Sequence, residues 1–261
     1  MRRDKITENQ ADIDNMSAFA HVITSTQNPQ IKFAVKLRDS AKARREHGQF
    51  FLEGYRLCMD ALENGYTPEL LFCTDKFDLP GAVRISESVA QKLGDTVTPQ
   101  GIFGLFKANS PAPAQQLSGK IIALENLQDP ANLGAIARTA EALGIDCLVV
   151  SGGCDVYHPK ALRASMGALL RLPVTQIEDS PSWLEQCELP CYAAVPVGAA
   201  ITPPECDFTA GAVIVIGNEG NGLSNEVIAA CDARLTIPMR GRAESLNAAA
   251  AAAILMWELC K

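Results

Sequence analysis

AVIVIGNEGNGLSNEVIAACDARLTIPMRGRAESLNAAAAAAILMW, residues 212–257, is the stretch that decides the fold. It joins an apolar strand, a glycine-rich loop, a helix, a second strand, a polar loop and an alanine-rich helix. Two loops therefore emerge from the ends of neighbouring strands, which is where a ligand pocket usually forms in an open α/β sheet. The sequence predicts such a pocket between these two loops.

The chain upstream of this stretch continues the same alternation of strands and helices. We expect strands at 121–126, 147–152, 192–197, 212–217 and 234–239, and helices at 130–143, 159–170, 224–230 and 244–259. Continuous apolar strands between helices are typical of a mostly parallel sheet that helices cover on both faces. The predicted fold class is therefore α/β.

A smaller α/β domain precedes this one. Strands at 49–53, 70–74 and 101–106 alternate with helices near 31–45, 55–65 and 88–93, and Glu53 and Gly54 are assigned to a local turn. Residues 108–120, ANSPAPAQQLSGK, have the composition of a linker. We divide the chain into a flexible tail at 1–20, a domain at 21–107, a linker at 108–119 and a second domain at 120–261.

Composition limits the classes of function. The chain has 261 residues, enough for two domains, and a net charge of -7, which argues against coating nucleic acid by bulk charge. Nine cysteines without a Cys-x-x-Cys pair suggest neither a disulfide framework nor a metal site, so a cytoplasmic location fits best. We expect no signal peptide and no membrane span.

One segment is strongly basic in this acidic chain. Between residues 31 and 45 there are six bases (Lys32, Lys36, Arg38, Lys42, Arg44 and Arg45) against one acid, Asp39. The segment is either an ordinary solvated helix face or a surface that contacts the phosphates of a nucleic acid.

The helix expected at 130–143 leaves one arginine away from its apolar face. Asp129 is the expected N-cap and Pro130 occupies the first turn. Arg138 projects opposite the apolar side chains, where it is either solvated or free to meet a ligand, and Asn132 can cap amides or bind. In residues 158–174, the bases Lys160, Arg163 and Arg171 stand beside small residues, which favours close packing over anion contact.

The glycine loop GNEGNGLSNE, residues 217–226, does not match a known phosphate-binding pattern. The case for a binding site in this loop is strengthened by Glu219, which stands between glycines, and by the order of the segments that follow. These are the segment around IPM and then ESLN before the last helix. Ser245 and Asn247 can also be explained as a helix cap. The alanines that follow suit close packing or a subunit interface.

Three motifs in this order resemble the SpoU (TrmH-like) family of RNA 2′-O-methyltransferases, within the SPOUT superfamily. The motifs are NLQDPANLGAIARTAEALG, IVIGNEGNGLS and LTIPMRGRAESLNAAAAAAI. The stretch from ITSTQNPQIK to FFLEG resembles the family's N-terminal substrate-binding module, which is similar to the L30e fold. The resemblance covers about residues 23 to 260.

This resemblance implies a deep trefoil knot in the second domain, one of the rare exceptions to unknotted chains. It also implies that S-adenosylmethionine lies in the knot, held mainly by backbone groups. The positions that would bind this cofactor are Gly217, Asn218, Glu219, Ile237, Pro238, Met239 and Leu246.

The resemblance further implies a homodimer that joins through the knotted domains, and an RNA substrate whose ribose 2′-hydroxyl is methylated. Catalytic roles would fall to Asn132, Arg138, Glu219, Ser245 and Asn247, with Arg138 contributed across the dimer. RNA would be bound by Lys32, Lys36, Arg38, Arg44, Arg45 and Arg163. No metal and no membrane are expected to take part.

Ribosomal RNA is favoured over transfer RNA as the substrate, by analogy with the L30e-like module. A non-catalytic RNA-binding assembly factor that keeps the fold is the alternative. A nucleotide-binding oxidoreductase is disfavoured because the sequence lacks the required glycine order and acidic ribose partner.

Overall fold

The computed structural model describes residues 22–109, 117–196 and 200–261. The predicted tail at 1–20 lies outside these residues, as does most of the predicted linker. The chain separates into two compact units. One is built from the chain up to Leu62 and from Thr67 to Lys107, and the other from Glu63 to Tyr66 and from Ala108 onward.

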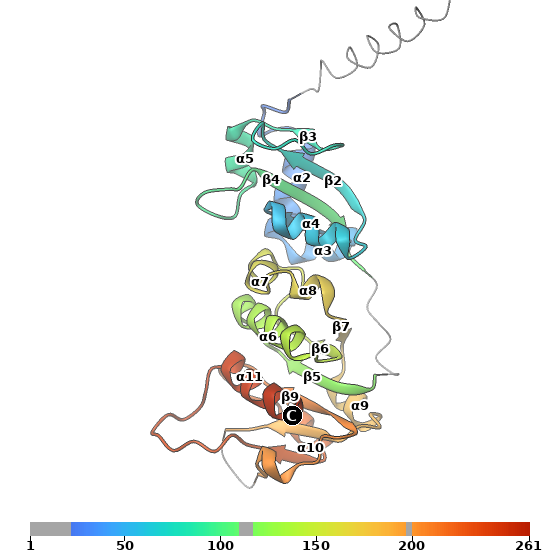
Figure 1. The fold of residues 1–261 in the computed structure, drawn as a ribbon, viewed down its shortest axis with the longest axis vertical. Helices are drawn as coiled ribbons and strands as arrows, with labels where there is room; N and C mark the ends of the chain where they lie inside the picture. The colour runs from blue at the N-terminus through green and yellow to red at the C-terminus, as the bar shows by residue number, and fades with distance from the viewer. Residues whose placement is uncertain (1–21, 110–116, 197–199) are drawn as a thin grey trace, which may run out of the picture. The chain divides into compact units, whose positions relative to one another are not determined.

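The first unit is a four-stranded sheet with helices packed against it (Figure 1). Its elements are α2 (Pro29–Asp39), α3 (Ala41–His47), β1 (Gln49–Glu53), α4 (Tyr55–Glu63), β2 (Pro68–Cys73), β3 (Val83–Arg84), α5 (Glu87–Leu93) and β4 (Ile102–Lys107). The strand order is β1-β4-β2-β3, with β4 antiparallel to both of its neighbours. Phenylalanines such as Phe51, Phe72 and Phe103 fill its core with the buried faces of α2 and α5.

The helix predicted at 31–45 is two helices, because the chain turns at Ser40. This residue is extended, and its side chain accepts a hydrogen bond from the N–H of Ala43, which caps the start of α3. Gly54 turns the chain after β1 with a φ of 103°, as expected, but the Glu53 side chain does not serve this local turn. The Glu53 carboxylate accepts hydrogen bonds from the Asp95 N–H and the Thr96 hydroxyl.

The second unit has a six-stranded sheet in the order β10-β8-β9-β5-β6-β7, in which every strand pair is parallel. The predicted mostly parallel α/β sheet is therefore confirmed. Its elements are β5 (Gly119–Glu125), α6 (Pro130–Leu143), β6 (Cys147–Ser151), α7 (Pro159–Ala164), α8 (Ala168–Arg171), β7 (Val174–Ile177), α9 (Ser180–Glu185), β8 (Cys191–Ala194), η2 (Pro203–Glu205), β9 (Gly211–Ile216), α10 (Asn225–Ala230), β10 (Ala233–Leu235) and α11 (Ala248–Leu259).

Helices cover both faces of this sheet. Alternate residues of the central strands, such as Ile121 and Val213, lie in one apolar cluster with Leu184 of α9 and Val227 of α10. On the other face, α11 packs against β9 and α6, and α6 packs against α7 and α8. This arrangement brings the starts of α6 and α11 to the carboxyl edge of the central strands, where β9 also ends (Figure 1).

Several predicted boundaries in this unit were wrong, and the strand expected at 192–197, for example, ends at Ala194. The helix expected at 159–170 is broken, because Met166 and Gly167 have positive φ values of 51° and 87°. The strand expected at 234–239 ends at Leu235, because its partner Ala194 is the last residue of β8. The last helix begins at Ala248, not at Glu244, because Asn247 is its N-cap.

Candidate functional site

The loops that follow β8, β9 and β10 surround a cavity of about 490 Å³ at the carboxyl edge of the parallel sheet. Its walls combine the glycine loop, the segment after β10 and the first turns of α11. Of the residues predicted to bind the cofactor, Gly217, Asn218, Glu219, Ile237, Met239 and Leu246 line the cavity, and Ser245 lines it as well. Pro238 does not line the cavity and is exposed.

The glycine loop has a shape that its own backbone determines. Asn218 and Gly222 exchange two backbone hydrogen bonds of 3.0 Å, and the Asn218 side chain accepts from the N–H groups of Gly220 and Asn221. A Cβ at Gly217 would lie 2.3 Å from the carbonyl carbon of Gly222. No other residue therefore fits at position 217 without moving the loop.

Glu219 fastens this loop to the start of α6. Its carboxylate accepts hydrogen bonds from the N–H groups of Gln128 and Asp129, both 3.0 Å, and from Nδ2 of Asn132 at 2.9 Å. Partial burial raises the pKa of Glu219, but these three donors outweigh it and the net shift of the pKa is downward. The carboxylate thus stays charged and occupied, which suits a positioning residue better than a general base.

Asn132 connects Glu219 to the last helix. While its Nδ2 donates to Glu219, its Oδ1 accepts from Nδ2 of Asn247 at 3.2 Å. Asn247 in turn caps α11, because its Oδ1 accepts from the N–H groups of Ala249 and Ala250. The three predicted side chains Asn132, Glu219 and Asn247, which lie far apart in the sequence, therefore form one hydrogen-bonded chain.

Arg138 does not join this chain. It is exposed, and it forms no hydrogen bond or ion pair with the residues that the structure describes. Helix geometry places it about 9 Å along α6 from Asn132 and about 120° around the axis. The arginine and the polar chain therefore face different directions.

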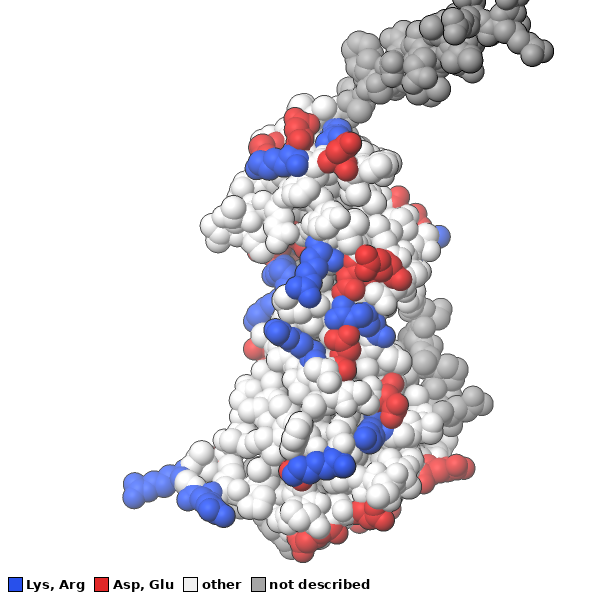
Figure 2. Space-filling view, in the orientation of Figure 1, with Lys and Arg blue, Asp and Glu red and all other residues white. Residues whose placement is uncertain are grey.

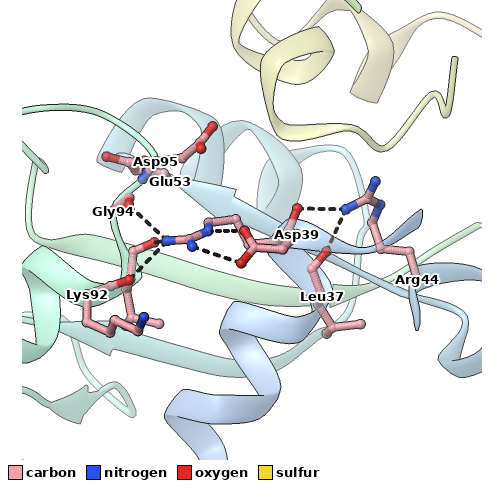
Figure 3. Close-up of polar contacts among 9 residues, drawn as sticks. Leu37, Asp39, Arg44, Glu53, Lys92, Gly94 and Asp95 are labelled. Atoms are coloured by element: carbon pink, nitrogen blue, oxygen red, sulfur yellow. Dashed lines mark hydrogen bonds and ion pairs between the residues drawn. The ribbon is translucent and has the colours of Figure 1, made fainter. Parts of the chain in front are cut away.

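Two of the bases predicted to bind RNA have structural roles instead (Figure 3). Arg44 is buried, and its guanidinium donates to the carbonyl oxygens of Leu37 and Arg38 at the end of α2. Arg38 pairs with Asp39 and donates to the last carbonyls of α5, including that of Gly94. Both guanidinium groups satisfy backbone oxygens that would otherwise lack donors, so we do not retain these two arginines among the residues proposed to bind RNA.

The remaining predicted RNA-binding bases differ in exposure. Lys32, Lys36 and Arg45 are exposed on α2 and α3, whereas Arg163 is half-buried in α7. The packing interpretation of the small residues near Arg163 is confirmed. A Cβ at Gly134 of α6 would lie 2.5 Å from both the Ala161 carbonyl oxygen and the Ala164 Cβ.

Sequence reasoning missed several residues of the site. Gln128 and Asp129 supply backbone donors to Glu219, and Glu125 accepts from the backbone and hydroxyl of Ser224, which caps α10. Arg234 lines the cavity. Its position beside IPM could have drawn attention to it, since bases are scarce in the second domain.

Metal ligands and membrane helices are not found in the described ranges. Among residues 22–109, 117–196 and 200–261, no group of three His, Cys, Asp or Glu side chains could hold a metal ion. No helix in this part of the chain is long and apolar enough to cross a membrane.

Comparison with known proteins agrees with this geometry. Residues 119–257 match the model of the SpoU rRNA methylase family, and residues 28–104 match the MRM3-like substrate binding domain. An uncharacterised tRNA/rRNA methyltransferase of Synechocystis is 34% identical over 257 residues, covering 90% of this chain and 92% of that protein. The chain therefore belongs to the SpoU rRNA methylase family.

Two further relatives have more specific descriptions. The 23S rRNA (guanosine(2553)-2′-O)-methyltransferase RlmP of Bacillus subtilis is 30% identical and covers 91% of this chain and 98% of its own. The crystal structure of an AdoMet-bound rRNA methyltransferase from Sinorhizobium meliloti superimposes with a TM-score of 0.82 at 28% identity, over 91% of this chain and 96% of that one.

Proposed function

We propose that this protein transfers a methyl group from S-adenosylmethionine to a ribose 2′-hydroxyl of ribosomal RNA. The observation that carries the proposal is the hydrogen-bonded chain of Glu219, Asn132 and Asn247 beside the cavity. It joins the three sequence motifs at one edge of the sheet. Ribosomal RNA is chosen because the Bacillus subtilis relative is named a 23S rRNA methyltransferase.

The cavity fits the methyl donor. Its volume of about 490 Å³ lies within the usual range for small-molecule sites, and its walls include apolar side chains such as Leu223, Ile237 and Leu246. The backbone groups of residues 237–246 make no backbone hydrogen bonds with other described residues, so they are free for the adenine. When bound, the cofactor supplies an electrophilic methyl group on its sulfonium.

The chain's own residues position the acceptor hydroxyl for transfer. A ribose hydroxyl is a poor nucleophile, so most of the rate must come from in-line placement within about 3 to 3.5 Å of the methyl group. Ser245 lines the cavity, and Asn132 and Asn247 stand beside it. Glu219 holds Asn132 in the orientation that this placement needs.

Arg138 polarises the hydroxyl through the adjacent phosphate. An arginine is a poor general base because a guanidinium does not give up its proton in proteins, but its planar fork binds phosphate well. Because Arg138 is exposed and faces away from Asn132 in its own subunit, it serves the site of a second subunit. The proton then leaves to phosphate or water.

A homodimer supplies this second subunit. The exposed residues of α11 include Ala250, Ile254 and Trp257, which repeat at intervals of four and three and so form an apolar stripe. Trp257 is 57% exposed, and α11 packs directly against the helix that carries Arg138. Dimer formation through this stripe would bury it and bring Arg138 toward the partner.

The remaining parts of the proposal follow the family. The segment after β10 would pass through a loop as a deep trefoil knot, which the packing of α11 against α6 and β9 supports. Residues 21–107 would bind RNA through Lys32, Lys36 and Arg45, joined by a linker at 108–119 to the methyltransferase domain at 120–261. All nine cysteines are free thiols, which favours the reducing cytoplasm.

Binding and transfer assays test the proposal. Calorimetry should show binding of S-adenosylmethionine and none of NAD, and the purified protein should methylate ribosomal RNA in preference to transfer RNA. Binding without transfer to either RNA would favour a non-catalytic assembly factor. Preference for transfer RNA would overturn the choice of substrate.

Mixing two inactive variants tests the role of Arg138 across the dimer. Arg138→Ala should abolish transfer while leaving cofactor binding unchanged, and Gly217→Ala should abolish cofactor binding. Random mixing should restore about a quarter of wild-type activity, because half of the dimers are mixed and each carries one complete site. No recovery in dimers shown to exchange subunits would place Arg138 in the site of its own subunit.

A further inference from the structure

Two arginines at the mouth of the cavity have no role in the site described so far. From residue 108 to the end, the chain carries nine lysines and arginines against sixteen acids. Several of these bases are held in ion pairs, among them Lys160 with Asp129, Arg171 with Glu141 and Lys261 with Glu258. Arg240 and Arg242, by contrast, form no ion pair or hydrogen bond with any residue that the structure describes.

Their place in the chain puts them beside the cavity. Met239 on one side of them and Ser245 on the other both line the cavity wall, so residues 240–244 form a short loop that begins and ends there. All residues from 240 to 247 are exposed. Figure 2 shows basic side chains projecting at the tip of the loop that joins β10 to α11 in Figure 1.

The charge of this loop is unusual for its surroundings. Glu244 is the only acid among residues 236–247, in a domain where acids outnumber bases. A solvated surface arginine needs no explanation by itself. Two of them on one loop, unpaired, and next to the wall of the cavity that holds the methyl donor, provide a positive surface where the negatively charged RNA must approach.

We propose that Arg240 and Arg242 bind the phosphates that flank the target nucleotide. This rests on the proposed function and adds a substrate-binding surface to it. Guanidinium groups match the oxygens of a phosphate with paired hydrogen bonds, and phosphate contacts fix the register of a strand without reading its bases.

The test compares two variants that lose equal charge. In R240A/R242A both loop arginines are removed. The control K76A/K107A removes two exposed lysines of the other unit. Lys76 pairs with Glu87, and Lys107 pairs with Glu69. Affinity for deproteinised 23S ribosomal RNA is measured by filter binding across salt concentrations, and S-adenosylmethionine affinity by calorimetry.

We expect R240A/R242A to bind the RNA about tenfold or more weakly, with the slope of log affinity against log salt reduced by about 1.4 for two lost phosphate contacts. The control should keep the wild-type slope, R240K/R242K should restore the slope because lysine also neutralises a phosphate, and all variants should bind the cofactor normally. Equal RNA affinity in R240A/R242A and wild type would overturn the inference, as would an unchanged salt slope in R240A/R242A. If the wild-type protein transfers no methyl group, the proposed function itself fails. The comparison of RNA affinities is independent of that result, because it does not measure transfer.

Discussion

Replacing Glu219 by glutamine removes the charge that holds the glycine loop to α6. In the structure, Oε1 accepts from the Asp129 N–H and from Asn132, while Oε2 accepts from the Gln128 N–H. A glutamine keeps one acceptor oxygen and turns an NH2 group toward the remaining donors. Either orientation therefore loses at least one hydrogen bond and sets donor against donor.

The size of this effect follows from the surroundings of the carboxylate. A hydrogen bond to a charged group contributes about 1.5 to 3 kcal/mol when protected, but Glu219 is exposed, so about 1 kcal/mol for each affected bond is a better value. The loss of about 1 to 2 kcal/mol from loop ordering corresponds to a roughly tenfold weaker binding of S-adenosylmethionine.

Calorimetry measures this directly, with Glu185→Gln as the control. Glu185 lies exposed at the end of α9 and makes no hydrogen bond or ion pair with described residues, so its loss of charge should leave cofactor affinity unchanged. If Glu219→Gln binds the cofactor as tightly as the control, the carboxylate does not order the loop and the reasoning is wrong.

The difference in stability between wild type and Glu219→Gln should depend on pH. Because the pKa of Glu219 is lowered on folding, its contribution is present above the ordinary value of 4.5 and is lost as the pH falls toward the folded pKa. The difference in stability between wild type and Glu219→Gln should therefore shrink below pH 4.5, and a difference that grew on acidification would contradict the assignment.

Further substitutions test the packing. Gly217→Ala should abolish measurable cofactor binding, because its Cβ meets the backbone of the same loop, whereas Gly241→Ala, which has open space, should leave it unchanged; equal effects in calorimetry would contradict this. Gly134→Ala should lower the free energy of unfolding by about 1 to 3 kcal/mol through overpacking of α6 against α7, and an unchanged denaturation midpoint would refute it. Arg44→Ala should destabilise the protein by about 1 to 3 kcal/mol in denaturant titration with little effect on RNA affinity. Lys36→Ala should weaken RNA binding with little effect on stability. Loss of RNA binding in Arg44→Ala alone would make Arg44 an RNA contact.

Local sequence features predicted the elements that depend on them. The bounds of α6 follow from Asp129 as N-cap, Pro130 in the first turn and Gly144 in the left-handed conformation at the end. Each of these residues lies directly at an end of the helix, so the sequence alone indicates where the helix begins and stops. The break at Met166 and Gly167 was missed because α7 and α8 have helix-forming composition. The change of direction between α7 and α8 depends instead on how closely they pack against α6 at Gly134.

Contacts made only in the folded chain explain what the sequence could not show. Nothing in the sequence between 31 and 45 distinguishes Arg38 and Arg44 from Lys32 or Lys36, since the difference arises from carbonyl groups that the folded chain brings to them. The contact between Glu219 and Asn132 spans 87 residues. The order of the motifs predicted that these residues share a site, but only the structure gives the hydrogen bonds.

The central claim is the transfer of a methyl group to a ribose hydroxyl. The most direct measurement incubates the purified protein with ribosomal RNA and S-adenosylmethionine carrying a labelled methyl group, followed by alkaline hydrolysis of the RNA. Methylation of the 2′-hydroxyl blocks alkaline cleavage at that nucleotide, so the account predicts label in alkali-resistant dinucleotides. Label in mononucleotides, which would mean methylation of a base, or no label in RNA at all would contradict it.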